Sequence, residues 1–257
     1  PAIETVGGTA VYARLTFPDY VPDWAQVAQL ISPKTRMIIV NSPHNPTGSL
    51  LSAVDREKLA KLITGTQIVV LSDEVYEHIL FDGEIHASLC AHPQLAARTL
   101  VVSSFGKTFH ITGWKIGYVV GPAELMAEFR KVHQFNVFTV HGPSQLALAD
   151  YMQEADRHLR LAAFYQEKRD FFGALMAPTP FELLPCRGTY FQLASYQRIS
   201  DLPDREFAEW MTRTIGVAVI PVSAFYAHRH DDRVVRFCFA KQDKTLMEAA
   251  ARVCKAL

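Results

Sequence analysis

The chain has 257 residues, of which 49% are hydrophobic and 20% are charged. Its 26 basic and 26 acidic residues give a net charge of +0, which excludes the basic surface typical of nucleic-acid-binding proteins. No apolar run reaches the length that spans a bilayer. We therefore expect a globular protein with a substantial core, and neither a nucleic acid nor a membrane as a partner.

The cysteines and histidines do not indicate a metal site. The stretch HRHDDR at 228–233 holds two histidines, but its many charges favour a solvated loop. The four cysteines are widely spaced and form no Cys-x-x-Cys pair. This spacing predicts reduced, mostly buried thiols in a cytoplasmic protein. The cysteines are Cys90, Cys186, Cys238 and Cys254.

Apolar runs in the first half of the chain predict a layered sheet. Short β-branched runs are typical of buried strands, and they occur at 35–41, 67–73, 99–104 and 115–121. Helical spacing predicts a helix at 52–64, with Ser52 as its N-cap and Gly65 at its end. This strand–helix–strand order predicts an α/β fold with a mostly parallel sheet flanked by helices.

The second half of the chain predicts a long helix and a smaller unit. Amphipathic spacing predicts helices at 122–135, 143–154 and 157–176, after which Pro178 and Pro180 interrupt the pattern. Further on, we expect strands at 181–185, 188–195, 216–221 and 233–239, and helices at 203–215 and 244–257. The expected parts are a large domain over 1–156, an interdomain helix over 157–177 and a small C-terminal α+β domain over 178–257.

Three polar motifs follow predicted strands, where open α/β sheets bind their ligands. NSPHNPTGS at 41–49 is a turn by its chemistry, and its prolines would hold the Asn45 amide in place. SDEVY at 72–76 puts Asp73 at a strand end, either as a helix N-cap or as a partly buried carboxylate aimed at a cation. Tyr76 would share its side of the first helical turn.

The third motif, SSFGKT at 103–108, places Ser104 and Lys107 after the next strand. Its GKT resembles part of a phosphate-binding P-loop. However, Val101 stands where that motif requires a glycine, so we exclude a P-loop. A lysine on a glycine-containing turn at the end of a buried strand calls for another explanation.

The motifs resemble those of class I and II aminotransferases, which are fold-type I enzymes that use pyridoxal 5′-phosphate. The resemblance is carried, in the family's order and approximate spacing, by NSPHNPTG, SDEVYEHI, SSFGKTFHITGWKIGY and RVVRFCFA. The motifs are most similar to those of the bacterial methionine and aromatic aminotransferases, which are related to the kynurenine and glutamine transaminases. The resemblance implies a homodimer that transfers the amino group of methionine or an aromatic amino acid to a 2-oxo acid.

The resemblance also implies which residues hold the ring of the cofactor. Lys107 would form a Schiff base with the cofactor's aldehyde and, once displaced by the substrate, act as general base. Asp73 would pair with the pyridine nitrogen and keep it protonated. Asn45 and Tyr76 would hydrogen-bond the 3′ oxygen of the ring.

Further roles follow from the same resemblance. Ser104 and Lys115 would bind the phosphate, although many relatives carry arginine at the position of Lys115. Arg236 would clamp the α-carboxylate of the substrate with its planar guanidinium. We expect His110 to pack or hydrogen-bond near the lysine loop, and Trp114 to pack beside the phosphate loop.

Several expectations remain open at this stage. A carbon–sulfur lyase on the same scaffold and a non-catalytic protein that keeps the fold are the alternatives. The aromatic residues Phe135, Phe138 and Phe164 would lie in the core or on the dimer surface. The opening PAIETVGG resembles the middle of the large domain of this family. We therefore expect the large domain to be N-terminally incomplete in this chain.

Overall fold

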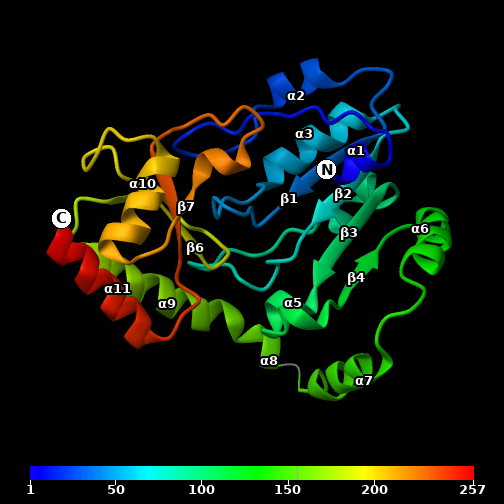
Figure 1. Ribbon diagram of the computed structural model, residues 1–257. Coiled ribbons are helices and arrows are strands. Elements are labelled where there is room, and N and C mark those ends of the chain that lie inside the picture. Colours follow the sequence, from blue (N-terminus) through cyan, green and yellow to red (C-terminus); the bar gives the residue numbers. More distant parts are fainter. Residues whose placement is uncertain (155) are drawn as a thin grey trace.

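The computed structural model describes residues 1–154 and 156–257, and its first sheet contains four strands (Figure 1). They are β1 (Met37–Asn41), β2 (Val69–Asp73), β3 (Thr99–Ser104) and β4 (Gly117–Val120). The strands lie in chain order; β1, β2 and β3 are parallel, and β4 is antiparallel to β3. The predicted α/β fold with a mostly parallel sheet is therefore confirmed.

Helix α3 (Ala53–Ile63) connects β1 to β2 and begins with a capping box. The Ser52 hydroxyl accepts a hydrogen bond from the Asp55 backbone N–H at 3.1 Å, and the Asp55 carboxylate accepts one from the Ser52 N–H at 2.8 Å. Gly65 follows the helix with a φ of +75°, which suits a residue without Cβ. The predicted cap and end are confirmed, and the buried face of the helix packs on the sheet through Leu59, Ala60 and Ile63.

Four short helices lie in segments for which the sequence patterns indicated none. They are α1 (Ala2–Thr5), α2 (Trp24–Leu30), η1 (Leu89–Ala91) and α4 (Pro93–Ala96). Asp23 caps α2 by accepting a hydrogen bond from the Ala25 N–H at 2.9 Å. The Trp24 indole donates to the Asp55 carboxylate at 2.8 Å, which ties α2 to the start of α3.

The second sheet is antiparallel and has the order β5-β6-β8-β7. Its strands are β5 (Glu182–Leu183), β6 (Phe191–Ser195), β7 (Ile220–Pro221) and β8 (Val234–Cys238). The helices of this region are α10 (Asp204–Trp210), its π-helical continuation η3 (Met211–Ile215), the 3₁₀ turn η4 (Val222–Phe225) and α11 (Asp243–Ala256). The central strands and both long helices were predicted.

The strands of the second sheet are shorter than predicted. Gly188 forms an isolated bridge with Leu80 instead of extending β6, and Thr189 has a φ of +70°. Gly216, with a φ of +74°, ends the π-helical turn, and Val217 and Val219 then insert into the core before pairing begins. Apolar runs alone do not separate residues that pair in a sheet from residues that only fill a core.

Helix α9 (Leu161–Met176) packs beside α11, as Figure 1 shows. The predicted single helix over 157–176 is wrong at its start, because a separate turn, α8 (Asp156–Leu159), precedes it. Leu159 is 63% exposed, and the buried stripe begins only at Leu161. Further along α9, this stripe joins the main hydrophobic core through Tyr165, Phe172 and Met176.

Residues near the N-terminus pack on the second sheet. Tyr20 lies in one hydrophobic cluster with Leu184, Leu193, Val222 and Val234. Tyr226 of the second half donates a hydrogen bond from its hydroxyl to the Leu15 carbonyl at 2.6 Å. The segment around 15–22 therefore joins the two halves of the chain.

Helices α6 (Ala123–Asn136) and α7 (Gly142–Tyr151) lie beyond β4 at the outer side of the molecule (Figure 1). Their exposed face carries Phe135, which is 88% exposed, and Phe138, which follows α6 and is 79% exposed. Phe164 on α9 is also exposed. These three side chains lie outside the core, so the expectation of a core position is wrong for them.

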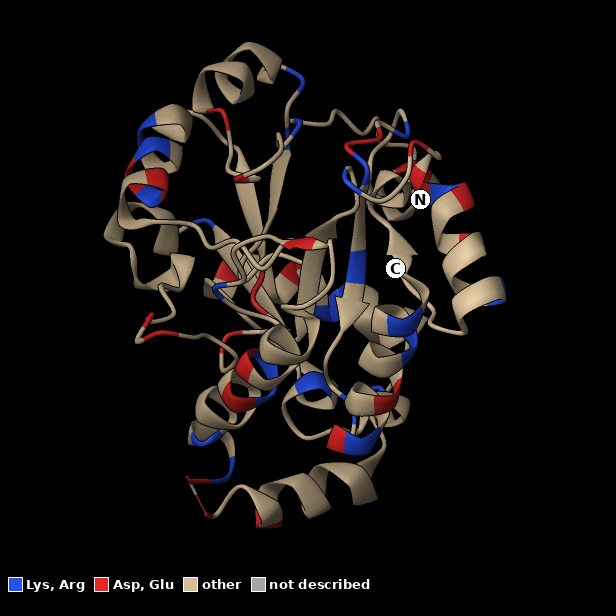
Figure 2. Ribbon diagram, turned by 90° about the vertical axis from the view of Figure 1, so that its left-hand side faces the viewer, with Lys and Arg blue, Asp and Glu red and all other residues tan. Residues whose placement is uncertain are grey.

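Charges of both signs are spread over the helices and loops, as Figure 2 shows. Within 1–154 and 156–257, no helix is both long and apolar enough to cross a membrane. All four cysteines are free. The expectation that most are buried is wrong, since Cys186 alone is buried and Cys254 lies on the exposed side of α11.

Candidate active site

The carboxyl ends of the first three strands meet at one edge of the first sheet. Asn41 at the end of β1 is paired in register with Asp73 at the end of β2, and the Asn41 amide donates to the Asp73 carbonyl at 2.9 Å. Asp73 is paired in turn with Val102, two residues before Ser104. The sequence prediction that polar residues of successive strands come together is confirmed by this register.

Asn45 is held in the loop after β1 and faces a residue of the second sheet. Its backbone N–H donates to the Asn41 side-chain oxygen at 2.9 Å. Its own side-chain oxygen accepts a hydrogen bond from the Arg236 guanidinium at 2.7 Å, across 191 residues of sequence. The two sheets therefore contribute to the same site.

Arg236 on β8 lies between two aromatic rings. Its guanidinium carbon is 3.9 Å from the ring centre of Phe191 and 5.3 Å from that of Phe225. Its Nε is buried, and no group in the described part of the chain hydrogen-bonds to it. An arginine placed in this way retains donors for a further acceptor, and a carboxylate is the acceptor that its planar geometry suits.

Asp73 is half-buried at the end of β2. One of its carboxylate oxygens accepts from the Val75 N–H at 3.2 Å, as in an N-cap, although no helix follows. Burial raises the pKa of Asp73, and the Glu74 charge adds to this; the Val75 hydrogen bond and the Lys107 charge oppose it. Asp73 and Lys107 thus lie within electrostatic reach of each other.

The neighbouring Glu74 is buried and takes part in a hydrogen-bond network. Its carboxylate accepts from the Ser72 hydroxyl at 2.8 Å, the His86 ring at 2.6 Å and the Leu89 N–H at 3.1 Å. Burial alone would raise the pKa of Glu74, yet the hydrogen bonds from His86 and Ser72 outweigh it and lower that pKa. This network anchors the turn after β2.

Tyr76 lies in a hydrogen-bonded turn, so the expected first helical turn after Asp73 is absent from this segment. Backbone hydrogen bonds from Glu77 to Glu74 and from Ile79 to Tyr76 close the turn. The Tyr76 ring is buried edge-on against Tyr190, with ring centres 5.3 Å apart. Burial keeps its pKa above the ordinary tyrosine value, so its hydroxyl stays protonated.

Lys107 lies in a short helix, α5 (Phe105–Thr108), directly after β3. Ser104 caps this helix by accepting from the Gly106 N–H at 3.2 Å. A Cβ on Gly106 would come within 2.9 Å of the Thr112 Cα, so glycine is needed where the turn folds back on itself. The lysine itself is half-buried.

Lys115 ends the 3₁₀ turn η2 (Thr112–Trp114) in the left-handed conformation, with a φ of +56°. It is exposed, and it lies just before the start of β4, where Gly117 pairs with Ser104. Trp114 is 45% exposed and so is not packed inside. The His110 ring and the Tyr165 hydroxyl share a hydrogen bond of 2.8 Å. The expectation that His110 packs or hydrogen-bonds near the lysine loop is confirmed.

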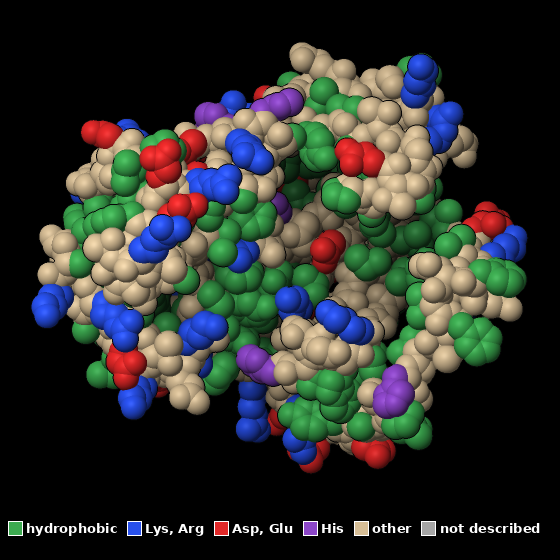
Figure 3. Space-filling model, in the orientation of Figure 1, with side chains coloured by type: hydrophobic (Ala, Val, Ile, Leu, Met, Phe, Trp, Pro, Cys, Tyr) green, Lys and Arg blue, Asp and Glu red, His purple; other side chains and the backbone are tan. Residues whose placement is uncertain are grey.

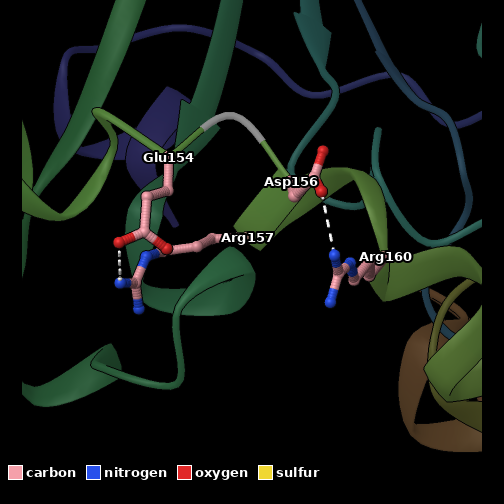
Figure 4. Close-up of a pocket in the computed structure, with 4 residues that line it drawn as sticks. All are labelled: Glu154, Asp156, Arg157 and Arg160. Atoms are coloured by element: carbon pink, nitrogen blue, oxygen red, sulfur yellow. Dashed lines mark hydrogen bonds and ion pairs between the residues drawn. The ribbon is translucent and has the colours of Figure 1, made fainter.

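Figure 3 shows a hollow near the middle of the molecule, with hydrophobic, acidic and basic side chains around it. Two other hollows contain none of the predicted site residues. One, near the start of α8, is lined by Glu154, Asp156, Arg157 and Arg160 (Figure 4). Its four described charged side chains pair with each other, Glu154 with Arg157 at 2.7 Å and Asp156 with Arg160 at 2.9 Å.

The predicted site residues fall into two groups. Asn45 and Arg236 contact each other directly, and Asp73, Ser104 and Lys107 lie at the ends of neighbouring strands. The Glu74–His86 contact and the Arg236–Phe225 contact were missed. SDEVY has no apolar alternation that would indicate a buried Glu74, and no local pattern could pair Glu74 with His86 twelve residues away.

Comparison with known proteins identifies the family. The family model for aminotransferase class I and II matches residues 1–253. The chain is 47% identical to the methionine aminotransferase of Escherichia coli strain K12 over 254 residues, 98% of this chain and 66% of that protein. It is 33% identical to kynurenine–oxoglutarate transaminase 1 of Rattus norvegicus, covering 99% of this chain and 68% of that protein.

Solved structures show the same likeness. An Escherichia coli protein with a methionine aminotransferase function superposes with a TM-score of 0.97 at 47% identity, covering 99% of this chain and 68% of that one. The N-succinyldiaminopimelate aminotransferase of Mycobacterium tuberculosis gives 0.93 at 35% identity, covering 99% and 67%. The chain spans about two thirds of the length of these relatives. It therefore belongs to the class I and II aminotransferases, whose cofactor is pyridoxal 5′-phosphate.

Proposed function

We propose that this protein transfers the amino group of methionine or an aromatic amino acid to a 2-oxo acid. The observation that carries the proposal is Arg236, whose buried Nε has no hydrogen-bond partner among the described residues. Its guanidinium contacts Asn45 at the edge that also holds Lys107 and Asp73. An arginine with free donors beside a lysine and a carboxylate suits a substrate that carries both an α-carboxylate and an amine.

The residues at this edge fit the cofactor. The Asp73 carboxylate has a raised pKa and accepts one hydrogen bond, from the Val75 N–H. It can therefore accept a further hydrogen bond from a protonated ring nitrogen. Lys107 supplies an amine to the aldehyde. Ser104 at the end of β3 supplies a hydroxyl to the phosphate, and Lys115 in the turn before β4 supplies a positive charge. Asn45 and Tyr76 complete the set as polar groups for the ring oxygen.

When bound, pyridoxal phosphate withdraws electrons from the α-carbon of the substrate. The side chains of this chain do the remaining work. Asp73 holds the proton on the ring nitrogen, because a nearby carboxylate stabilises the positive charge there. Lys107 Nζ would accept the proton from the substrate's α-carbon and would return it, as general acid, to the C4′ carbon of the cofactor. Arg236 fixes the α-carboxylate, so that this proton faces Lys107.

The substrate side chain is proposed from the surroundings of Arg236. Phe191 and Phe225 flank its guanidinium, and Phe225 is 45% exposed, so a side chain bound beside the α-carboxylate meets aromatic surface. A thioether or an aromatic ring gains from such contacts. The 47% identity to a methionine aminotransferase supports the same choice.

The reaction is tested by a product assay on the full-length protein loaded with pyridoxal phosphate. With methionine and a 2-oxo acid, we expect the 2-oxo acid of methionine and the amino acid of the acceptor in equal amounts. Release of ammonia without consumption of the acceptor would instead indicate a lyase on this scaffold. No turnover of methionine, phenylalanine or tyrosine would refute the proposed substrates.

Replacing Arg236 with lysine is expected to lower kcat/KM for methionine by about 10- to 100-fold, mostly through KM, because a point charge cannot replace a planar, bidentate donor. Steady-state kinetics on the loaded enzyme measures this. Arg205→Lys is the matched control, since Arg205 is exposed on α10 and only pairs with Glu209 at 3.8 Å. Equal kinetics for the Arg236 variant and the control would remove Arg236 from the substrate site.

The domain boundaries and the cellular location are part of the proposal. The proposed domains are 1–156 and 178–257, with 157–177 as the helix between them; the two separate sheets and the position of α9 support this division. The four free thiols support a cytoplasmic location.

A homodimer is also proposed, supported by the apolar face of α6 and the residues after it. Phe135 and Phe138 are 88% and 79% exposed, and large aromatic side chains at such exposure are typical of an interface. Phe135→Glu combined with Phe138→Glu is expected to halve the molar mass measured by analytical ultracentrifugation, because a dimer interface would bury both charges. Val54→Glu, at an exposed apolar position on α3, should leave the mass unchanged; an unchanged mass in both variants would exclude this face as the interface.

A further inference from the structure

The turn that carries Lys107 is too short to hold itself in place. Helix α5 has four residues, and an isolated helical turn of this length is unstable in water. Its position therefore depends on contacts with other elements. Phe105 packs on Tyr118 of β4 with ring centres 5.3 Å apart, and Phe109 packs on Tyr151 of α7 at 5.4 Å.

A hydrogen bond to a third element completes these contacts. His110, three residues after Lys107, has a φ of +56°, a strained conformation for a residue with a Cβ. In this conformation its Nε2 lies 2.8 Å from the Tyr165 hydroxyl on α9. The turn is thereby joined to the helix that packs against the second half of the molecule.

Tyr165 also contacts the residues around the substrate arginine. It is fully buried, and its ring centre lies 5.6 Å from that of Tyr190. Tyr190 contacts Tyr76 at 5.3 Å and Phe191 at 4.7 Å, and Phe191 lies under Arg236. A continuous line of packed rings thus runs from the hydroxyl that holds the lysine turn to the guanidinium that faces Asn45.

Burial keeps the Tyr165 hydroxyl available for this hydrogen bond. Burial, with a smaller contribution from Tyr190, keeps the pKa of Tyr165 above the ordinary tyrosine value, so the hydroxyl remains protonated. A protonated hydroxyl can either donate to His110 Nε2 or accept from it, so this hydrogen bond forms with either tautomer of the ring. Loss of this hydrogen bond would leave the buried Tyr165 hydroxyl unpaired, or would leave the turn around Lys107 without its link to α9.

We propose that Tyr165 is a positioning residue for the proposed transamination: through its hydrogen bond to His110 it fixes the turn that aims Lys107 at the α-carbon of a substrate held by Arg236. Tyr165 touches neither the cofactor nor the substrate in this role. Its catalytic consequence rests on the proposed function, whereas its effect on the turn does not.

The effect on the turn is tested by amide hydrogen exchange on the full-length protein without cofactor or substrate. Backbone hydrogen bonds from Phe109 to Phe105 and from Ile111 to Gly106 close the turn. In Tyr165→Phe, we expect the Phe109 and Ile111 amides to exchange about 10-fold faster, because one hydrogen bond holding the turn is lost. Unchanged exchange in this variant would overturn the proposal.

Tyr196→Phe is the matched control for Tyr165→Phe. Tyr196 is also fully buried, and its hydroxyl donates to the Leu202 carbonyl at 2.8 Å, away from the lysine turn. Tyr196→Phe, like Tyr165→Phe, removes a buried hydroxyl oxygen and its one hydrogen bond of 2.8 Å. We expect it to leave the exchange of the turn unchanged; equal acceleration in the two variants would overturn the proposal in favour of a general loss of stability.

His110 provides a second pair of variants, which keeps the test valid if a tyrosine variant fails to fold. Alanine and glutamine meet the same backbone strain at a positive φ, but glutamine keeps a polar atom near the position of Nε2. We expect His110→Ala to reproduce the fast exchange of Tyr165→Phe and His110→Gln to restore protection. Equal exchange in these two variants would overturn the role of the hydrogen bond.

Kinetics on the loaded enzyme then separates positioning from folding. We expect Tyr165→Phe and His110→Ala to lower kcat about 3- to 10-fold while KM changes by less than about twofold, because the substrate site is kept and only the aim of Lys107 is lost. A change in KM alone would overturn the positioning role. Absence of transamination in the unaltered protein would refute the proposed function, while the exchange result would still decide the role of Tyr165 in the turn.

Discussion

Replacing Lys107 with alanine is expected to lower kcat for the transamination of methionine by about 10⁴-fold or more. The amine of Lys107 has two tasks in the proposed mechanism: it holds the cofactor and it moves the proton at the substrate's α-carbon. Loss of a positioned general base alone costs about 10²- to 10⁴-fold, and loss of the nucleophile adds to it. Single-turnover kinetics with the loaded variant measures the effect.

The control for this variant is Lys131→Ala. Lys131 is exposed on α6 and pairs only with Glu128, at 2.6 Å. The Lys131→Ala variant should retain the activity of the unaltered protein. Activity in the Lys107 variant within about 10-fold of this control would contradict the proposed mechanism, since no other described lysine lies directly after β3.

Replacing Asp73 with asparagine is expected to have the second largest effect, a fall in kcat of about 10²- to 10³-fold. An amide has no charge to keep a proton on a ring nitrogen, and a lost charged hydrogen bond of this kind is worth several factors of ten. The loss should appear in kcat more than in KM, because Asp73 does not contact the α-carboxylate. Asp201→Asn, at a fully exposed position paired with Arg233, is the control.

Asp73→Asn is also expected to preserve or raise the melting temperature of the cofactor-free protein. Burial raises the pKa of Asp73 in the folded state, so its ionisation favours the unfolded state, and stability falls as the pH rises through this pKa. Asparagine removes that unfavourable charge. A lower melting temperature together with lower kcat would indicate that Asp73 is structural, and differential scanning calorimetry near neutral pH distinguishes the two cases.

The sheet and its functional edge could be predicted from the sequence because both depend on local patterns. The first three β-branched runs each ended in a polar residue, and strands that run parallel bring such ends together. The observed register of Asn41 with Asp73 follows from this rule. The cap at Ser52 was equally local, since it depends on one side chain and the next turn of helix.

Contacts between distant segments could not be predicted in this way. Arg236 and Asn45 are 191 residues apart, and only the packing of the second sheet against the first brings them together. The hydrogen bond between His110 and Tyr165 depends on the positive φ of His110, and no residue pattern around position 110 predicts that conformation. Resemblance to a family supplied roles for Arg236 and Asn45, but it supplied none for Tyr165.

The exact lengths of the outer strands were also beyond the sequence patterns. Val217 and Val219 have the alternation of a strand, yet they fill the main core before β7 begins. Leu159 has an apolar side chain within a helical pattern, yet it faces solvent, because the buried stripe of α9 starts two residues later. In both places, packing against other elements decides between two uses of the same apolar residues.

The most direct test of the central claim is to locate the lysine that carries the cofactor. The full-length protein is loaded with pyridoxal phosphate, reduced with borohydride, digested and analysed by mass spectrometry. We predict that the cofactor mass lies on Lys107, and that adding methionine before the reduction removes it, since the substrate's amine takes the place of the lysine. A label on Lys115 or on any other lysine, or a label on Lys107 that methionine leaves unchanged, would contradict the account.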